Sequence, residues 1–110
     1  MDEVTEMKRP WGAWYVLEHK PGSHKVKRLE LLCDHSISLQ YHMHRSETWV
    51  ITQGQGRVIV DAEAFDVKVG DTFVVPKETI HQIKNTGNVT LVAIEVQIGE
   101  ITEESDIIRV

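Results

Sequence analysis

The feature that most constrains this chain is an alternation of apolar and polar residues with a period of two. Side chains on a β-strand alternate between two faces, so the alternation predicts strands that bury one face and expose the other. Each run is short and ends in residues typical of turns, such as KPGSH, QGQG and NTGN. No amphipathic helical stretch of comparable length accompanies them. The clearest runs are residues 25–32, 48–53, 57–62, 71–76 and 90–98.

Short strands separated by turns predict a sandwich or a small closed antiparallel barrel. The fold class expected from the sequence is therefore all-β. At 110 residues the chain has a size typical of one domain, and neither an internal repeat nor a linker divides it. We expect a single domain over residues 1–110.

Composition narrows the classes of ligand and location. A formal net charge of −5 argues against general nucleic-acid binding, which needs a basic surface. No apolar run is long enough to predict a membrane span or a secretory signal. The single cysteine, Cys33, cannot form an internal disulfide and suits a reducing compartment, so we expect a cytoplasmic protein. The basic stretch KVKR, residues 25–28, stays compatible with a small anionic ligand.

Potential metal ligands gather in LQYHMHRSE, residues 39–47. On a strand, Gln40, His42 and His44 share one face. We interpret the following HRS as a tight hairpin, which would bring the carboxylate of Glu47 against His42. Farther along the chain, His81 begins the expected strand HQIKN. Imidazole nitrogen, carboxylate oxygen and amide oxygen are all metal donors, so these residues predict one metal site.

Two segments of the chain resemble the cupin superfamily. The second cupin pattern consists of a glycine, a proline, a histidine and an asparagine at fixed spacings. Gly70, Pro76, His81 and Asn85 match it, and Glu78 stands where glycine is usual. The resemblance implies a small antiparallel jelly-roll β-barrel, the cupin fold, with His81 as a metal ligand.

The first cupin pattern can be aligned in two registers. If His42 and His44 form its histidine pair, only two residues separate the pair from Glu47, which is too few. If Gln40 and His42 take those places, four residues precede Glu47, and Gly54 then falls at its expected position.

We prefer the second register, in which Asp34 occupies the opening glycine position. His44 remains the rival of Gln40 as a ligand. One divalent transition metal per chain is implied, which could be zinc, manganese, cobalt, nickel or iron. The implied ligands are Gln40, His42, Glu47 and His81.

From Lys8 to Arg109 the chain resembles, more narrowly, the cupin domain of type II mannose-6-phosphate isomerases. In most of those bifunctional proteins the domain follows a mannose-1-phosphate guanylyltransferase domain. The most specific parts of the resemblance are RPWG, KVKR and the glutamine, histidine and glutamate of the first pattern. The resemblance implies that mannose 6-phosphate and fructose 6-phosphate are interconverted with the help of the metal.

Such a reaction needs a base that moves a proton between two carbons, and cations that hold a phosphate. The candidate bases are His44, Glu95 and Lys27. Period two places Glu95 on a polar face of its strand together with Gln97. The candidate phosphate-binding residues are Arg9, Lys27, Arg28 and Arg109, with Lys27 and Arg28 expected on opposite faces.

Two other functions remain open. One is a non-catalytic module that binds metal or sugar, and the other is an iron-dependent oxygenase, which usually has three histidines or two histidines and a carboxylate. We expect the tryptophans to pack in the core or at a dimer interface. A homodimer is expected because the N-terminal strand WGAWYVLE, residues 11–18, would otherwise leave a sheet edge unpaired.

Overall fold

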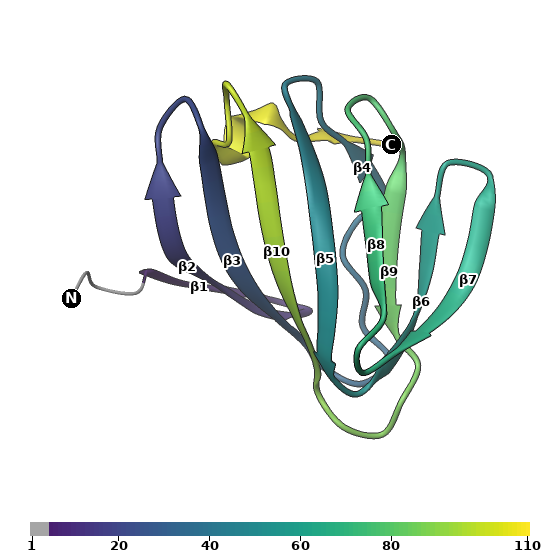
Figure 1. The fold of residues 1–110 in the computed structure, drawn as a ribbon. Helices are drawn as coiled ribbons and strands as arrows, with labels where there is room; N and C mark the ends of the chain where they lie inside the picture. The colour runs from purple at the N-terminus through teal and green to yellow at the C-terminus, as the bar shows by residue number, and fades with distance from the viewer. Residues whose placement is uncertain (1–4) are drawn as a thin grey trace.

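The alternating runs form two antiparallel sheets in the computed structural model, which describes residues 5–110 (Figure 1). One sheet has six strands, in the order β1 (Thr5–Arg9), β2 (Gly12–Lys20), β3 (His24–Leu31), β10 (Leu91–Gly99), β5 (Arg45–Gln53) and β8 (Thr72–Val75). The other has five, in the order β11 (Ile108–Arg109), β4 (Gln40–Tyr41), β9 (His81–Asn85), β6 (Gln55–Val60) and β7 (Glu63–Lys68).

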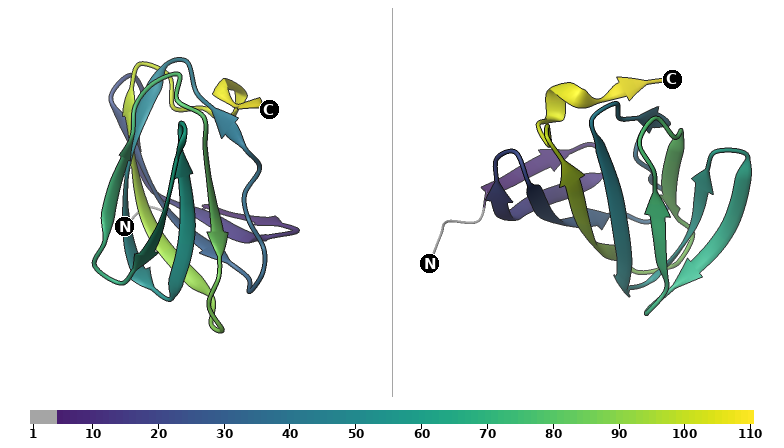
Figure 2. Two further views of the ribbon diagram at one scale, coloured as in Figure 1. Left: turned by 90° about the vertical axis from the view of Figure 1, so that its right-hand side faces the viewer. Right: turned by 45° about the horizontal axis from the view of Figure 1, so that its top comes forward.

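The two sheets lie face to face, as the turned view in Figure 2 shows. No ladder of hydrogen bonds closes them into one continuous barrel within residues 5–110. The only helical element in this range is a 3₁₀ turn, η1, at Glu104–Asp106. No helix in the same range has the length and apolar character needed to cross a bilayer. The all-β jelly-roll prediction is confirmed.

The core lies between the sheets and draws on both. Trp49 and Ile51 of β5 are each 1% exposed, and Val58 and Ile83 from the opposite sheet are buried to the same degree. Trp49 stacks on Phe73 with ring centroids 5.6 Å apart. Trp14 and Trp49 both belong to the core cluster, and Trp11 packs against it. The core interpretation of the tryptophans is therefore correct.

Three central strands change character along their inner faces. At the lower end of Figure 1 the buried side chains of β3, β5 and β10 are apolar, and toward the upper end they are polar or charged. On β3 leucines give way to lysines, and on β5 Ile51 and Trp49 give way to Glu47 and Arg45. On β10 apolar residues likewise give way to polar ones. The register aligns these changes, because Glu95 of β10 lies opposite both Lys27 and Trp49. Gln97 lies opposite Glu47 in the next row. The lower half of the interior is therefore a core, and the upper half is a polar site.

The hairpin expected between the two ligand segments is not formed. β4 contains only two residues and pairs with β9 and β11, whereas β5 pairs with β10 and β8. The connection through His42 crosses from one sheet to the other. The carboxylate of Asp106 accepts hydrogen bonds from the backbone N–H groups of Met43 and His44, at 3.1 and 2.9 Å. A side chain thus satisfies backbone donors that a hairpin would have paired.

Two residues that replace cupin glycines adopt backbone conformations that favour glycine. Asp34 has φ 64° and Glu78 has φ 62°, both in the left-handed region. The N–H of Glu78 donates to the carbonyl of His42 at 2.7 Å. The turn at Glu78 therefore supports the segment that carries a candidate ligand, and the glycine preference of the pattern has a conformational cause.

Candidate metal centre

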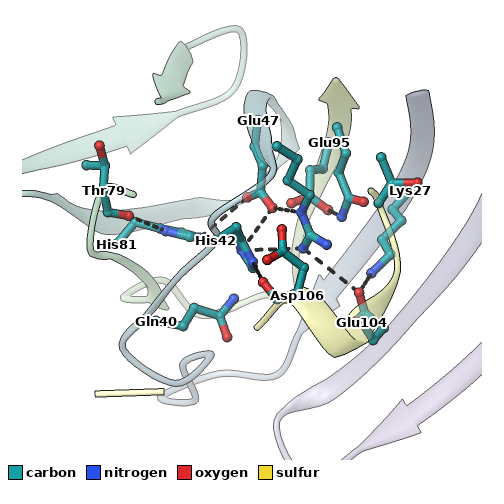
Figure 3. Close-up of polar contacts among 12 residues, drawn as sticks. Lys27, Gln40, His42, Glu47, Thr79, His81, Glu95, Glu104 and Asp106 are labelled. Atoms are coloured by element: carbon teal, nitrogen blue, oxygen red, sulfur yellow. Dashed lines mark hydrogen bonds and ion pairs between the residues drawn. The ribbon is translucent and has the colours of Figure 1, made fainter. Parts of the chain in front are cut away.

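Three buried side chains meet in the upper half of the interior (Figure 3). His42 follows β4, Glu47 lies on β5, and His81 begins β9. One candidate ligand atom from each lies within 4.8 Å of the others. His42 Nε2 is 3.1 Å from Glu47 Oε2, and His81 Nε2 is 3.4 Å from Glu47 Oε1. Each residue is at most 2% exposed.

Backbone carbonyls orient both imidazole rings. His42 Nδ1 lies 2.8 Å from the carbonyl oxygen of Asp106, and His81 Nδ1 lies 3.1 Å from that of Thr79. A carbonyl can only accept, so both Nδ1 atoms donate, and in a neutral ring Nε2 then carries the lone pair. His81 Nε2 is buried without a hydrogen-bond partner among the described residues. Both rings therefore present acceptor atoms to the carboxylate of Glu47.

Acceptor atoms this close to a carboxylate require positive charge between them, from protons on the rings or from a metal ion. Histidines that bind metals are commonly held in this way, with the second ring nitrogen donating to a carbonyl. Two imidazoles and a carboxylate suit zinc, manganese, cobalt, nickel or iron. The unpartnered His81 Nε2 and this donor set fit a divalent transition metal, which His42, Glu47 and His81 would hold together.

Glu47 is held ionised by its neighbours. Its burial raises the pKa of the carboxyl, but interactions with the neighbouring His42 and His81 outweigh burial and hold the pKa well below its usual range. Trp49 Nε1 donates to Glu47 Oε1 at 3.1 Å, and Arg45 Nε donates to Oε2 at 3.0 Å. A carboxylate ligand needs this charged form.

The two rivals for a further ligand position occupy different environments. Gln40 is half-buried and lies opposite His81 in the β4–β9 pair, so their side chains share one face. Figure 3 draws no contact between Gln40 and the clustered residues, and Gln40 Oε1 accepts a hydrogen bond from Ser38 at 3.0 Å. His44 is exposed. Gln40 as a ligand therefore stays a prediction.

A cavity of about 340 Å³ lies next to this cluster. His42, Glu47 and His81 are not part of its lining, but Arg45, which contacts both His42 and Glu47, is. Its lining includes Gln40 and four residues named as catalytic or phosphate-binding candidates, which are Arg9, Lys27, Glu95 and Arg109. Trp11, Trp14 and Trp49 also contribute to the wall. His44 and Arg28 are not part of this lining. Arg28 lies on the other face of β3, where its guanidinium is 3.3 Å from Glu30 and covers the ring of Tyr15.

Within the cavity wall, Lys27 and Glu95 are buried ionisable groups. Lys27 Nζ is 2.9 Å from Glu104 Oε2 and lies 3.8 Å above the ring of Trp14. Glu95 Oε1 accepts a hydrogen bond from Gln97 Nε2 at 3.1 Å. Burial, with the neighbouring charge of Glu47 as the next cause, raises the pKa of Glu95 well above its usual value. The polar face of β10 therefore points into the site.

Two contributors were missed from the sequence. Arg45 is 2% exposed and contacts both His42 and Glu47, although it lies inside the ligand motif as an apparent turn residue. Asp106 caps the segment before β5 and its carbonyl orients His42. Only for Arg45 did a signal exist, namely its position between two candidate ligands.

Comparison with known proteins agrees with this geometry. The family model described as mannose-6-phosphate isomerase C-terminal matches residues 1–110. A mannose-1-phosphate guanylyltransferase from Salmonella muenchen is 33% identical over 94% of this chain and 22% of its own length. The alginate biosynthesis protein AlgA of Pseudomonas syringae pv. tomato is 34% identical over 94% of this chain and 21% of its own length. The chain thus spans about a fifth of these relatives.

Among solved structures, the cupin domain of Cnp3 from Schizosaccharomyces pombe superposes with a TM-score of 0.74 at 22% identity. The match covers 79% of this chain and 64% of that one. At this identity the likeness establishes the fold. The complete match to the family model establishes the rest: the chain is a cupin domain that belongs to the mannose-6-phosphate isomerase C-terminal family.

Proposed function

We propose that this domain is a metal-dependent isomerase that interconverts mannose 6-phosphate and fructose 6-phosphate. The observation that carries the proposal is the convergence of His42, Glu47 and His81 beside a cavity whose wall holds cations and a buried carboxyl group. Membership of the family supports the choice of substrate. Gln40 is proposed as the fourth ligand, because it shares a face with His81.

A divalent metal held by these residues supplies a Lewis acid for the carbonyl and hydroxyl oxygens of the sugar. The remaining work falls to the chain's own side chains. Isomerisation moves a proton between C2 and C1 of the sugar, and we propose Glu95 as the base. Its carboxyl group lines the cavity, and its raised pKa brings it closer to the range in which a general base is efficient.

Other candidates suit the proton transfer less well. Lys27 is engaged by Glu104 and covered on one side by Trp14. The exposed side chain of His44 lies outside the cavity lining. We propose instead that Lys27 contributes to holding the phosphate, together with Arg9 and Arg109.

These three cations reach the cavity from separate elements, β3, β1 and β11. Arginine suits bidentate contact with phosphate, whereas lysine acts as a point charge. Arg109 lies opposite Gln40, which in turn lies opposite His81, so one row of side chains runs from the proposed phosphate site to the proposed metal site. This arrangement would fix one end of the sugar phosphate relative to the other.

A coupled assay of mannose 6-phosphate conversion, with zinc, manganese, cobalt, nickel or iron supplied in turn, tests the proposal. We expect turnover with at least one metal, and loss of turnover in Glu95→Gln with metal binding retained. Metal and sugar-phosphate binding without turnover in the wild type would instead identify a non-catalytic module. Oxygen consumption dependent on iron would identify an oxygenase.

We also propose a cytoplasmic homodimer. β1 pairs with β2, which contains most of WGAWYVLE, so β1 and not this segment forms that edge of the six-stranded sheet. An exposed edge strand is a template for pairing with another chain. Light scattering should give the mass of two chains, and a monomer mass at working concentration would contradict this part of the proposal.

A further inference from the structure

Arg45 places a permanent positive charge against the candidate ligand atoms. Its guanidinium is 2% exposed and donates through Nε to Glu47 Oε2 at 3.0 Å. Its Nη2 atom lies 3.3 Å from His42 Nε2. Because His42 Nδ1 donates to the carbonyl of Asp106, Nε2 of the neutral ring is the acceptor in this contact. The guanidinium therefore occupies lone pairs of two candidate metal ligands.

A metal ion and this guanidinium cannot both use His42 Nε2. A neutral imidazole has one lone pair on Nε2, which either accepts from Arg45 or binds a metal. Zinc bonds to nitrogen and oxygen are about 2.0–2.2 Å long, so a bound dication would also lie close to the guanidinium and repel it. Metal binding at His42 thus requires the Arg45 guanidinium to leave Nε2, and repulsion by the dication favours its leaving Glu47 as well.

The surroundings of Arg45 offer a place for the displaced guanidinium. Arg45 already lines the cavity. Its Nη1 atom donates a hydrogen bond to the carbonyl of Glu103 at 3.1 Å, and its Nη2 atom lies 3.9 Å from Glu104 Oε2. One side of the guanidinium therefore already faces acceptors of the C-terminal segment.

We propose that Arg45 is a placeholder cation. It neutralises the ligand atoms when no metal is bound, and a divalent metal displaces it from His42 and Glu47 toward Glu104 and the cavity. The inference rests on the proposed metal centre, and it adds that this centre always holds a cation, either the guanidinium or the metal.

The first test follows the Nε–H proton of Arg45 by NMR in ¹⁵N-labelled protein, with the signal assigned through its loss in Arg45→Lys. Without metal, we expect slow exchange with solvent, because the group is buried against Glu47. After one equivalent of zinc, exchange should accelerate about tenfold or more, as the buried charge-assisted hydrogen bond is lost. Calorimetry on the same sample establishes whether zinc is bound.

The outcomes separate the two proposals. Bound zinc with Arg45 Nε–H still protected would overturn the placeholder role and leave the metal centre intact. Failure to bind zinc, manganese, cobalt, nickel or iron, each supplied in turn, would overturn both. Bound zinc with accelerated exchange would support both.

A second test compares zinc affinities by chelator competition. Arg45→Met removes the competing cation, so zinc should bind about tenfold more tightly or better. Arg57→Met is the matched control, since Arg57 pairs with Asp66 at the surface of β6 and β7 and should leave the affinity unchanged. Weaker zinc binding in Arg45→Met would show that Arg45 supports the bound metal, which contradicts the placeholder role.

Discussion

Sequence spacing favoured Gln40 over His44 as a metal ligand. Alternation put Gln40 and His44 on one face with His42, and only the number of residues before Glu47 separated them. In the structure Gln40 lines the cavity opposite His81, while His44 is exposed and contributes its backbone N–H to Asp106. The choice of Gln40 remains a prediction that metal binding must test.

Truncation of each rival gives that test. Gln40→Ala should weaken metal affinity by at least the roughly 10- to 100-fold loss typical when an outer-shell partner is removed. His44→Ala should leave the affinity unchanged, because its side chain is exposed. Isothermal titration with zinc measures both. The reverse pattern would show that His44 is the ligand, and equal, negligible effects would exclude both.

Glu95 gives the wild type a pH dependence of stability with a defined sign. The folded-state pKa of Glu95 lies above its ordinary value of 4.5, so the folded chain keeps a proton that the unfolded chain releases. Its contribution to stability is therefore full below pH 4.5 and is lost as the pH rises toward the folded-state pKa. The folded-state pKa of Glu47 is instead lowered, so the contribution of Glu47 to stability is present above pH 4.5 and is lost as the pH falls toward that lowered pKa.

Glu95→Gln should remove the loss of stability above pH 4.5. Within this window the variant should gain on the wild type by up to about 1.4 kcal/mol per pH unit. Urea unfolding at several pH values, with a chelator present, measures the difference. Glu63→Gln on exposed β7 is the control and should follow the wild type. A variant that runs parallel to the wild type would show that folding does not raise the pKa of Glu95.

Residues differed in how far the sequence could place them. The period-two alternation predicted that β10 has a polar face. Whether that face points inward depends on the register of β10 with β3 and β5, which no local pattern encodes. Glu47 was expected to meet His42, and it does. The assignment of Arg45 to a turn failed because β5 begins at Arg45, which turns its side chain inward with Glu47 and Trp49.

At the scale of elements, the expected contact between His42 and Glu47 is present but the expected cause is wrong. A hairpin would have paired β4 with β5, yet these strands lie in different sheets. The segment between them is held by η1, which is distant in sequence. Cupin spacing included the three residues that meet in the structure, His42, Glu47 and His81, because the spacing reflects the whole fold. Period-two alternation relates only residues that are neighbours along the chain.

Asp106 of η1 is the side chain that stabilises this crossing. Asp106→Ala leaves the backbone N–H groups of Met43 and His44 without their charged acceptor, which should cost about 1.5–3 kcal/mol of unfolding free energy. Metal affinity should also fall, because His42 belongs to the loosened segment. Urea unfolding and zinc titration measure the two effects.

Glu103→Ala is the matched control for this element. The side chain of Glu103 is exposed and only its carbonyl contacts Arg45, so stability and zinc affinity should both stay near the wild type. Wild-type behaviour of Asp106→Ala would show that solvent replaces the carboxylate and that η1 does not position His42.

At the scale of the whole molecule, the space between the two sheets holds the apolar core at one end and the candidate site at the other. Apolar residues of both sheets fill the lower half, and the same strands present charged residues above it. The C-terminal segment crosses the upper end, as Figure 2 shows, and its Glu104 pairs with Lys27. The sandwich thus supports a site built from strands of both sheets and from η1.

The account depends most on a metal bound by His42, Glu47 and His81, and anomalous X-ray scattering from crystals grown with zinc tests this directly. We expect one strong peak per chain at the zinc edge, within bonding distance of His42 Nε2, Glu47 and His81 Nε2, and no peak there in Glu47→Gln. A zinc-saturated crystal with no peak at these residues, or a peak held by other residues alone, would contradict the account.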